Sequence, residues 1–435
     1  MSGGSAWTAA AVATVTAGYA LFSRRLSTTP VSAPMVFTGL GVLIGPAALD
    51  VLDMEHDAGS VLLLVEAALT LVLFTDAMTV RRRDLRTGGF LPLRLLAIGL
   101  VLTIGAGWLL AWPLLPGLTL WEFALVGAIL APTDAALGKA AIANPRVPPV
   151  VRQGLNVESG LNDGMVLPFF VLFLAALPGT ATSEEGLGGV FWRALVLSTA
   201  IGLAVGGLGG RSLQWSRRRG WITREWHQVF VLAIAFGAFT LADATEGSGF
   251  IAAWVAGFAF AVQLRKNPSG QQDEAHEPPA ELAEYLGGLL AQLSFLVFGA
   301  VLLGPALEHL DWRIVTYAVL SLTVIRMVPV AMALALSRLR PPTVAYIGWF
   351  GPRGLASVAL GMLVVEEHVP GVTLLGRVVA VTIGLSILLH GMSAAVLADR
   401  YGRWSEAAIE TTPGLREAEG TAEPDKHQKT SRRLR

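Results

Sequence analysis

Long apolar segments separated by short polar loops make up most of the first 400 residues. Each segment is 17 to 25 residues long, the range in which an α-helix crosses the hydrocarbon core of a bilayer. We therefore predict an all-α polytopic membrane protein. Its thirteen predicted transmembrane helices lie at residues 7–23, 33–51, 60–77, 92–112, 121–142, 153–177, 188–209, 227–244, 248–264, 285–306, 313–337, 343–366 and 373–397.

The loop charges alternate along this series of spans. Acidic or neutral loops separate the basic loops, and basic residues in short loops mark the cytoplasmic side of a membrane. The alternation predicts an outside N-terminus and an inside C-terminus, which requires an odd number of spans. The basic loops contain Arg24/Arg25, Arg81–Arg83 with Arg86, Arg146/Arg152, Arg217–Arg219 with Arg224, Arg265/Lys266, and Arg338/Arg340.

Composition supports an integral membrane protein. Apolar residues make up 53% of the chain and charged residues 15%, whereas a soluble domain carries about 25% charged residues. The net charge of 0 does not suggest a nucleic-acid partner, and the lack of cysteine excludes disulfides and thiolate metal sites. The first apolar run has no basic residues before it, so we interpret it as a span and not as a cleaved signal peptide.

The predicted spans define one transmembrane domain, residues 1–401. Residues 402–435 are polar and poor in large apolar side chains, which predicts a short disordered cytoplasmic tail. No Gly-rich phosphate loop with Lys-Ser/Thr is present, so no ATP site or other cofactor site is predicted.

A few ionisable residues fall inside the predicted spans. A charge in hydrocarbon is costly, so such residues are candidates for function. They are Glu66, Asp76, Asp134, Glu158, Asp163, Asp243, Arg326 and Arg353.

The span at 153–177 carries two of these acids five residues apart. Residues four apart share a helix face, so Glu158 and Asn162 form one stripe and Ser159 and Asp163 form the neighbouring one. Asp163 can then face a cavity and hold an ion with the Ser159 hydroxyl. Glu158, braced by Asn162, can pair with the mid-span Arg326 as a structural ion pair. The alternative is that both acids serve only ion pairs between helices.

Two spans contain signals for a helix break. Pro132 precedes Thr133 and Asp134 in the span at 121–142, and a mid-span proline removes a backbone hydrogen bond. Freed carbonyls, the Thr133 hydroxyl and Asp134 would supply oxygen ligands for a small cation. The alternative is a kinked packing helix with a capping Thr/Asp pair.

The second break signal runs from Gly348 to Gly354 in the twelfth span, with Gly351-Pro352-Arg353-Gly354 inside it. The fifth and twelfth spans are seven apart and so run in opposite directions. Discontinuous helices in two inverted halves indicate a transporter binding site. Arg353 would offset the helix dipoles at the break, or it would lie close enough to the cytoplasmic end to reach water.

Asp76 ends the third span, just before Arg81–Arg83, and allows two interpretations: an accessory ligand at a cytoplasmic funnel or an interfacial acid paired with those arginines. Ser159 and His390 are the only hints of a nucleophile and base, and no motif joins them. An intramembrane enzyme is therefore disfavoured.

An ordered set of motifs resembles the monovalent cation:proton antiporter family, which includes NhaP-type exchangers and animal sodium/proton exchangers. The motifs are Leu71 to Ala77, Thr133-Asp134, Glu158-Ser159 with Asn162-Asp163, Ser248-Gly249-Phe250 before Ala256-Gly257, Phe295 to Leu302, Arg326, and Gly351 to Gly354 with Ala359-Leu360.

The resemblance implies a fold of thirteen helices. Core helices, including 121–177 and 313–366, move against a dimerisation panel in a homodimer. The resemblance also implies that Asp163 carries the ion and the proton, while Thr133, Ser159, Asp134 and, in some members, Asp76 complete the site. Na⁺ would bind at Asp163, Thr133 and Ser159.

A mechanism follows as an expectation. Burial disfavours the charged form of a carboxylate, so a cation and a proton would compete for Asp163 while access alternates between the two sides. A single titrating acid beside Asn162 suggests electroneutral 1:1 exchange of Na⁺, or of K⁺ or Li⁺, for H⁺. The protein would carry out this exchange in the cell membrane and thereby contribute to pH homeostasis. The competing interpretations are a cation channel and a transporter of an organic solute.

Overall fold

The computed structural model describes residues 3–26, 29–50, 58–80, 90–134, 137–177, 187–266, 280–366, 369–412 and 414–418. Apart from one isolated bridge between Pro116 and Leu118, the regular structure in these residues is helical. In the first half of the chain the helices are α1 (Gly3–Leu26), α2 (Ala33–Ile44), α3 (Ala58–Thr79), α5 (Phe90–Arg94), η1 (Leu95–Leu100), α6 (Val101–Leu114), α7 (Leu120–Ile129), α8 (Lys139–Ala143), α9 (Pro149–Ala175) and α10 (Leu187–Arg218).

The second half continues in the same way. Its helices are α11 (Arg224–Asp243), α12 (Gly249–Lys266), α13 (Glu281–Phe298), η3 (Gly299–Leu303), α14 (Gly304–Glu308), α15 (Trp312–Leu322), α16 (Val324–Leu334), α17 (Pro341–Trp349), α18 (Leu355–Glu366), α19 (Val372–Thr411) and the single 3₁₀ turn η4 (Arg416–Ala418).

Every predicted span overlaps at least one of these helices. Within the described residues, eight helical segments are long and apolar enough to cross a membrane, and four shorter apolar helices accompany them, at Ala33–Ile44, Leu120–Ile129, Gly249–Arg265 and Leu355–Glu366. The prediction of an all-α membrane fold therefore agrees with the structure.

The outer surface of the helices is strongly apolar. Large side chains such as Leu63, Leu109, Trp112 and Val396 are 67%, 68%, 68% and 66% exposed. Soluble proteins rarely present so much contiguous apolar surface to water. A hydrocarbon environment removes this cost, which explains why the helices can bury polar residues inside and turn leucine, valine and tryptophan outward.

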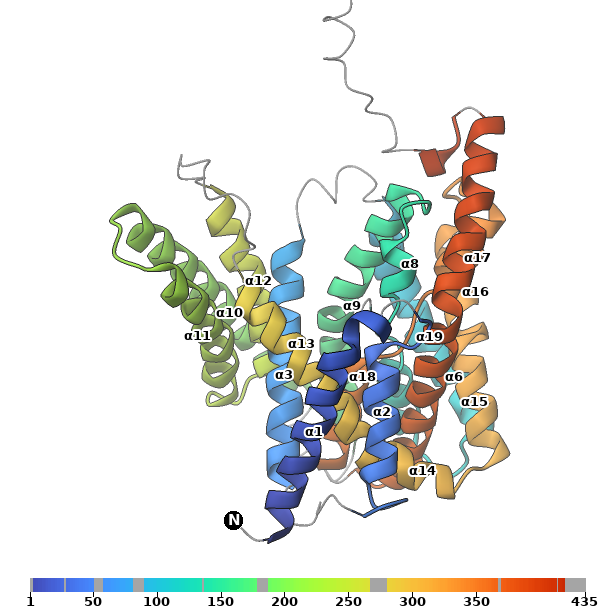
Figure 1. Cartoon of the computed structure of the whole chain (residues 1–435), viewed down its shortest axis with the longest axis horizontal. Coiled ribbons are helices and arrows are strands. Elements are labelled where there is room, and N and C mark those ends of the chain that lie inside the picture. The colour runs from blue at the N-terminus through green and yellow to red at the C-terminus, as the bar shows by residue number, and fades with distance from the viewer. Residues whose placement is uncertain are drawn as a thin grey trace, which may run out of the picture.

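The helices fall into two groups (Figure 1). Helices α10, α11 and α12 lie at one side of the view, where α11 and α12 pack against α3, while α6, α15, α16, α17 and α19 lie at the other. Helices α1, α2 and α13 lie between the groups. Helix α9 contacts α17 of the second group and α10 and α12 of the first, and it also contacts α3, α7 and α8. It therefore lies where the two groups meet.

Helix α9 is apolar enough to span a membrane yet carries polar residues at its centre. All residues from Val157 to Gly164 are buried, including Glu158, Ser159, Asn162 and Asp163. Polar groups removed from water need partners. The contacts of these four side chains therefore define the part of the fold in which function is to be sought.

The C-terminal segment differs from the sequence prediction. Helix α19 continues to Thr411, so residues 402–411 are helical and not part of a disordered tail. The Glu417 side chain is buried and accepts hydrogen bonds from the Arg340 backbone and the Thr343 hydroxyl, both at 2.8 Å. The polar composition of this segment did not predict the burial of Glu417, because its hydrogen-bond partners lie at the start of the distant helix α17. Residues 419–435 lie outside the described residues.

Candidate functional site

Two non-helical segments, distant in the sequence, cross next to each other. Helix α7 ends at Ile129 and residues 131–134 are non-helical, while a second non-helical stretch precedes α18. The backbone N–H of Asp134 donates to the Pro352 carbonyl at 2.8 Å. The Leu355 backbone N–H donates to Oδ2 of Asp134 at 3.1 Å. Each segment thus satisfies backbone groups that the other leaves open.

Two glycines make this crossing possible. A Cβ on Gly354 would collide with the carboxyl group of Asp134, and one on Gly351 would collide with the guanidinium of Arg326. Both neighbours are held in place by hydrogen bonds, so neither can yield easily. The glycines allow the backbone to approach charged groups directly, a use that only glycine serves.

Arg353 lies inside the crossing and is fully buried. Its Nη1 donates to the carbonyls of Ala131 at 3.0 Å and Pro132 at 3.3 Å, and its Nη2 donates to that of Ser321 at 3.4 Å. The carbonyl end of a helix carries partial negative charge. The guanidinium therefore satisfies and neutralises the chain just beyond the end of α7. Of the two sequence interpretations, the one in which Arg353 reaches water does not fit this burial.

Asp134 caps a helix that is distant from it in the sequence. One of its carboxylate oxygens accepts from the first backbone N–H of α18, so the residue caps a helix far away in the chain. The sequence predicted an ion ligand at this position or, alternatively, a capping Thr/Asp pair in a kinked helix. The signal for a cap of α18 is absent from the sequence because the capping residue is separated from the helix by more than 200 residues.

Replacing Asp134 with alanine should destabilise the protein by about 1 kcal/mol, the usual effect of losing a helix cap. Asparagine keeps an acceptor oxygen and should cost less. The check is the apparent melting temperature of the purified variants, followed by tryptophan fluorescence. Equal melting temperatures for Asp134→Ala and wild type would contradict the capping role.

Three polar side chains join the first crossing segment to α9. The hydroxyls of Thr133 and Ser159 lie 3.2 Å apart, and Nδ2 of Asn162 donates to Oγ1 of Thr133 at 2.6 Å. Sequence analysis expected Asn162 to brace Glu158, four residues away on the same helix. The structure instead gives the amide to Thr133, because the face of α9 that carries Asn162 packs against the broken segment.

Asp163 lies one residue beyond Asn162 and is 7% exposed. Its Oδ1 has no hydrogen-bond partner among the described residues, and neither does Oδ1 of Asn162. Oxygen atoms that are buried and unsatisfied are suited to accept a proton or a small hard cation. Among the described residues of this set, Asp163 is therefore the ionisable side chain with an unsatisfied oxygen, and the amide oxygen of Asn162 beside it is unsatisfied as well.

Asp76 of α3 approaches α9 at Gly160, where a Cβ would lie 3.5 Å from that of Asp76. No three acidic or histidine side chains of the described residues come close enough to hold a metal ion together. A cation here would need hydroxyl, carbonyl or water oxygens in addition to Asp163.

Glu158 and Arg326 form a buried ion pair. The distances are 2.7 Å from Nη1 to Oε1 and 3.0 Å from Nη2 to Oε2, and the two side chains are 2% and 3% exposed. A bidentate pair of this kind satisfies both charges. Because Arg326 is bound by Glu158, it is not available to neutralise Asp163.

The hydroxyl of Ser159 and the imidazole of His390 do not form a nucleophile–base pair in the described structure. Nδ1 of His390 lies 3.0 Å from the Ser386 carbonyl, and its Nε2 lies 2.9 Å from that of Trp349. The hydroxyl partner of Ser159 is Thr133. His390 thus serves helix packing.

A family profile described as "Sodium/hydrogen exchanger, transmembrane" matches residues 11–400. Among curated proteins, the chain is 25% identical over 341 residues to Na(+)/H(+) antiporter 2 of Zygosaccharomyces rouxii, covering 68% of this chain and 41% of the relative. It is 25% identical over 392 residues to the K(+)/H(+) antiporter NhaP of Alkalimonas amylolytica, covering 87% and 63%. The chain thus spans less than two thirds of the length of each of these relatives.

Among solved structures, the fold matches that of the sodium proton antiporter MjNhaP1 from Methanocaldococcus jannaschii with a TM-score of 0.75 at 19% identity. The match covers 92% of this chain and 98% of that one. Together with the apolar helices, these similarities describe an integral, multi-pass membrane protein.

Proposed function

The chain belongs to the sodium/hydrogen exchanger family, and from this premise we propose that it exchanges a monovalent cation, Na⁺ or alternatively K⁺ or Li⁺, for a proton across the cell membrane. Relatives named as Na(+)/H(+) and as K(+)/H(+) antiporters both match, so the family leaves the cation open. Either cation would use the same class of hard oxygen ligands.

The observation that carries the proposal is the state of Asp163. Its carboxyl group is buried, one oxygen lacks a partner, and the nearby Arg326 is occupied by Glu158. An unpaired charge in this position would be costly. The group therefore needs either a proton or a cation, and binding one excludes the other. Thr133 and Ser159 complete the cation site. The carboxylates of Asp76 and Asp134 make the electrostatic potential around it more negative.

Competition for one carboxylate yields obligate exchange. Asp163 carries the cation in one direction and the proton in the other, and it does not cross empty. Since Asn162 and not a second acid lies beside it, one charge moves each way and the cycle is electroneutral. Two other polar contacts hold together the helices that move as a unit: the Glu158–Arg326 pair, and the hydrogen bonds from Arg353 to the carbonyls just beyond the end of α7.

The proposed topology has thirteen membrane spans, with the N-terminus outside and the C-terminus inside. Helices α7 with α8, and α17 with α18, are the halves of two discontinuous spans in inverted repeats. Residues 1–401 form the antiporter domain, in which core helices including 121–177 and 313–366 move with alternating access. The remaining helices contribute a panel for homodimerisation.

Exchange in proteoliposomes tests the proposal. Adding Na⁺, K⁺ or Li⁺ outside vesicles with an acidic interior should dissipate the pH gradient, as reported by a pH-sensitive dye. Clamping the membrane potential with valinomycin and K⁺ should leave the Na⁺-driven rate unchanged if one charge moves each way. A rate that follows the potential would overturn the 1:1 stoichiometry, and cation flux without a proton requirement would indicate a channel.

A further inference from the structure

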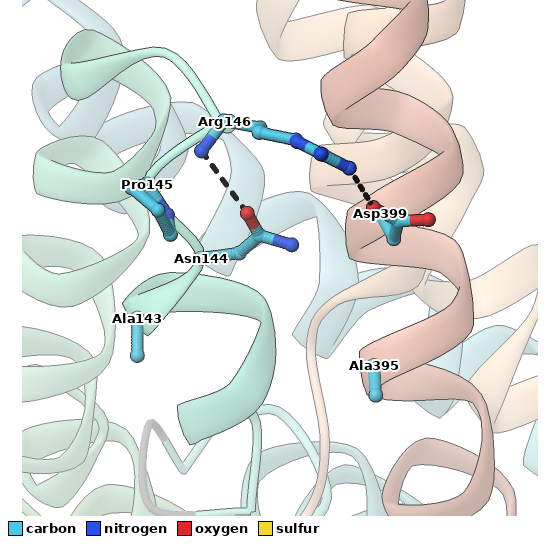
Figure 2. A pocket seen from close by; sticks show the side chains of 6 residues that line it. All are labelled: Ala143, Asn144, Pro145, Arg146, Ala395 and Asp399. Atoms are coloured by element: carbon cyan, nitrogen blue, oxygen red, sulfur yellow. Dashed lines mark hydrogen bonds and ion pairs between the residues drawn. The ribbon is translucent and has the colours of Figure 1, made fainter.

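Two cavities lie at the predicted cytoplasmic end of the molecule, next to the segment that joins α8 to α9. The larger, of about 520 Å³, is shown in Figure 2. Arg146 extends across it from the α8–α9 loop and donates to Asp399 of α19 at 2.5 Å. Asp399 also pairs with Arg403. The positive charge of Arg146 is therefore balanced by a carboxylate, and the cavity lies between helix α19 and the loop.

The smaller cavity, of about 240 Å³, has a different electrostatic character. Its lining comprises Ile142, Pro149, Arg152, Gln153 and Asn156. Nε of Arg152 is buried without a hydrogen-bond partner, and no carboxylate of the described residues forms an ion pair with this arginine. The cavity therefore holds an arginine whose charge is not balanced within the described structure.

The face of α9 links this cavity to the buried carboxylate. An α-helix turns about 100° per residue. Arg152, Asn156, Ser159 and Asp163 consequently lie within about 60° of one another on α9. Asn156 precedes Asp163 by seven residues, or about 10 Å along the axis. The cavity thus opens on the side of the helix that carries Asp163, two turns nearer the predicted cytoplasmic end.

We propose that this smaller cavity is the cytoplasmic entrance to the cation site, with Asn156 as its first oxygen ligand and Arg152 as the residue that sets the affinity for cytoplasmic cation. The inference rests on the proposed antiport function. A cation passing through the cavity comes within several ångströms of a guanidinium that stays charged at all relevant pH values. In a hydrated, partly screened cavity, repulsion at that distance lowers the apparent affinity for the entering cation about three- to tenfold.

Neutralising Arg152 tests the idea in everted membrane vesicles, in which the cytoplasmic face is outside. Arg152→Gln should lower the apparent KM for cytoplasmic Na⁺ or K⁺ about three- to tenfold and leave the maximal rate within about twofold. Arg152→Lys keeps the charge and should keep the wild-type KM. Because charge repulsion is screened by ions, the difference between Arg152→Gln and wild type should shrink when choline chloride is added.

Two further variants make the test specific. Arg146→Gln removes the balanced arginine of the larger cavity and should not change KM. Asn156→Asp adds a negative charge to the exposed wall of the smaller cavity and should lower KM even if Arg152→Gln does not fold.

The outcomes separate this inference from the antiport proposal. An unchanged KM in folded Arg152→Gln and Asn156→Asp, or an equal change in Arg146→Gln, would overturn the assignment of the entrance. Wild-type vesicles that show no cation-driven proton movement would instead refute the antiport function itself.

Discussion

Replacing Asp163 with asparagine is expected to reduce cation-driven proton exchange to the background of empty liposomes. The amide has nearly the same shape as the carboxyl group but can neither release a proton nor neutralise a bound cation. Because the variant no longer buries an ionisable group, it should fold and melt at or above the wild-type temperature. The measurement is dissipation of a pH gradient in proteoliposomes after addition of Na⁺, K⁺ or Li⁺.

A second readout does not depend on transport. A cation that binds only the folded protein raises its melting temperature with concentration. Wild type should show this shift with its transported cation, and Asp163→Asn should not. Asp243→Asn serves as the matched control, since Asp243 ends helix α11 and is exposed. It should retain both exchange and the cation-dependent shift. Normal exchange by Asp163→Asn would eliminate Asp163 as the shared carrier.

The second large effect is expected on stability. Glu158→Ala leaves Arg326 buried without its bidentate partner. Removing one partner of a buried ion pair costs about 3–5 kcal/mol, because the remaining charge is neither hydrated nor paired. The variant should unfold at a markedly lower temperature or denaturant concentration than wild type. Exchange, where folded protein is recovered, should fall much less than in Asp163→Asn.

A double variant distinguishes the stranded charge from other effects of the truncation. Glu158→Met with Arg326→Met replaces the pair by apolar side chains and should recover most of the lost stability. Glu246→Ala is the surface control, because its pair with Arg193 is exposed, at 2.9 Å, and such pairs contribute at most about 1 kcal/mol. If Glu158→Ala were no more harmful than Glu246→Ala, the pair would have no structural importance.

Much of the helical architecture could be predicted from the sequence. The thirteen apolar segments each overlap a helix, residues 131–134 around Pro132 are non-helical, and of the predicted break from Gly348 to Gly354 only the part after Trp349 is non-helical. These features depend on local properties: apolar run length, a missing backbone N–H, and glycine freedom. The C-terminal end of α19 was misplaced because residues 402–411 are polar, whereas a helix that continues beyond a membrane needs no apolar composition.

The partners of the polar side chains could be predicted only in part. The pairing of Glu158 with Arg326 was predicted because a mid-span arginine needs a buried acid and Asp163 was assigned to the ion, and the structure contains that pair. Asn162 was assigned to the neighbouring turn of its own helix but donates to Thr133. Asp134 was assigned to an ion but caps α18. The first prediction used spacing along one helix and the second used the break at Pro132, whereas the hydrogen bonds of both residues depend on contacts between distant segments.

The sequence by itself determined that the protein spans a membrane, where its helices lie, and which few charges the membrane interior would contain, because hydrocarbon penalises charge regardless of the neighbours. Only the tertiary structure decided which function each of those charged residues has. The packing of α9 against the broken segments binds one carboxylate to an arginine, uses another to cap a helix, and leaves Asp163 with an oxygen unsatisfied. That division depends on which helix faces meet across hundreds of residues, information that no local pattern carries.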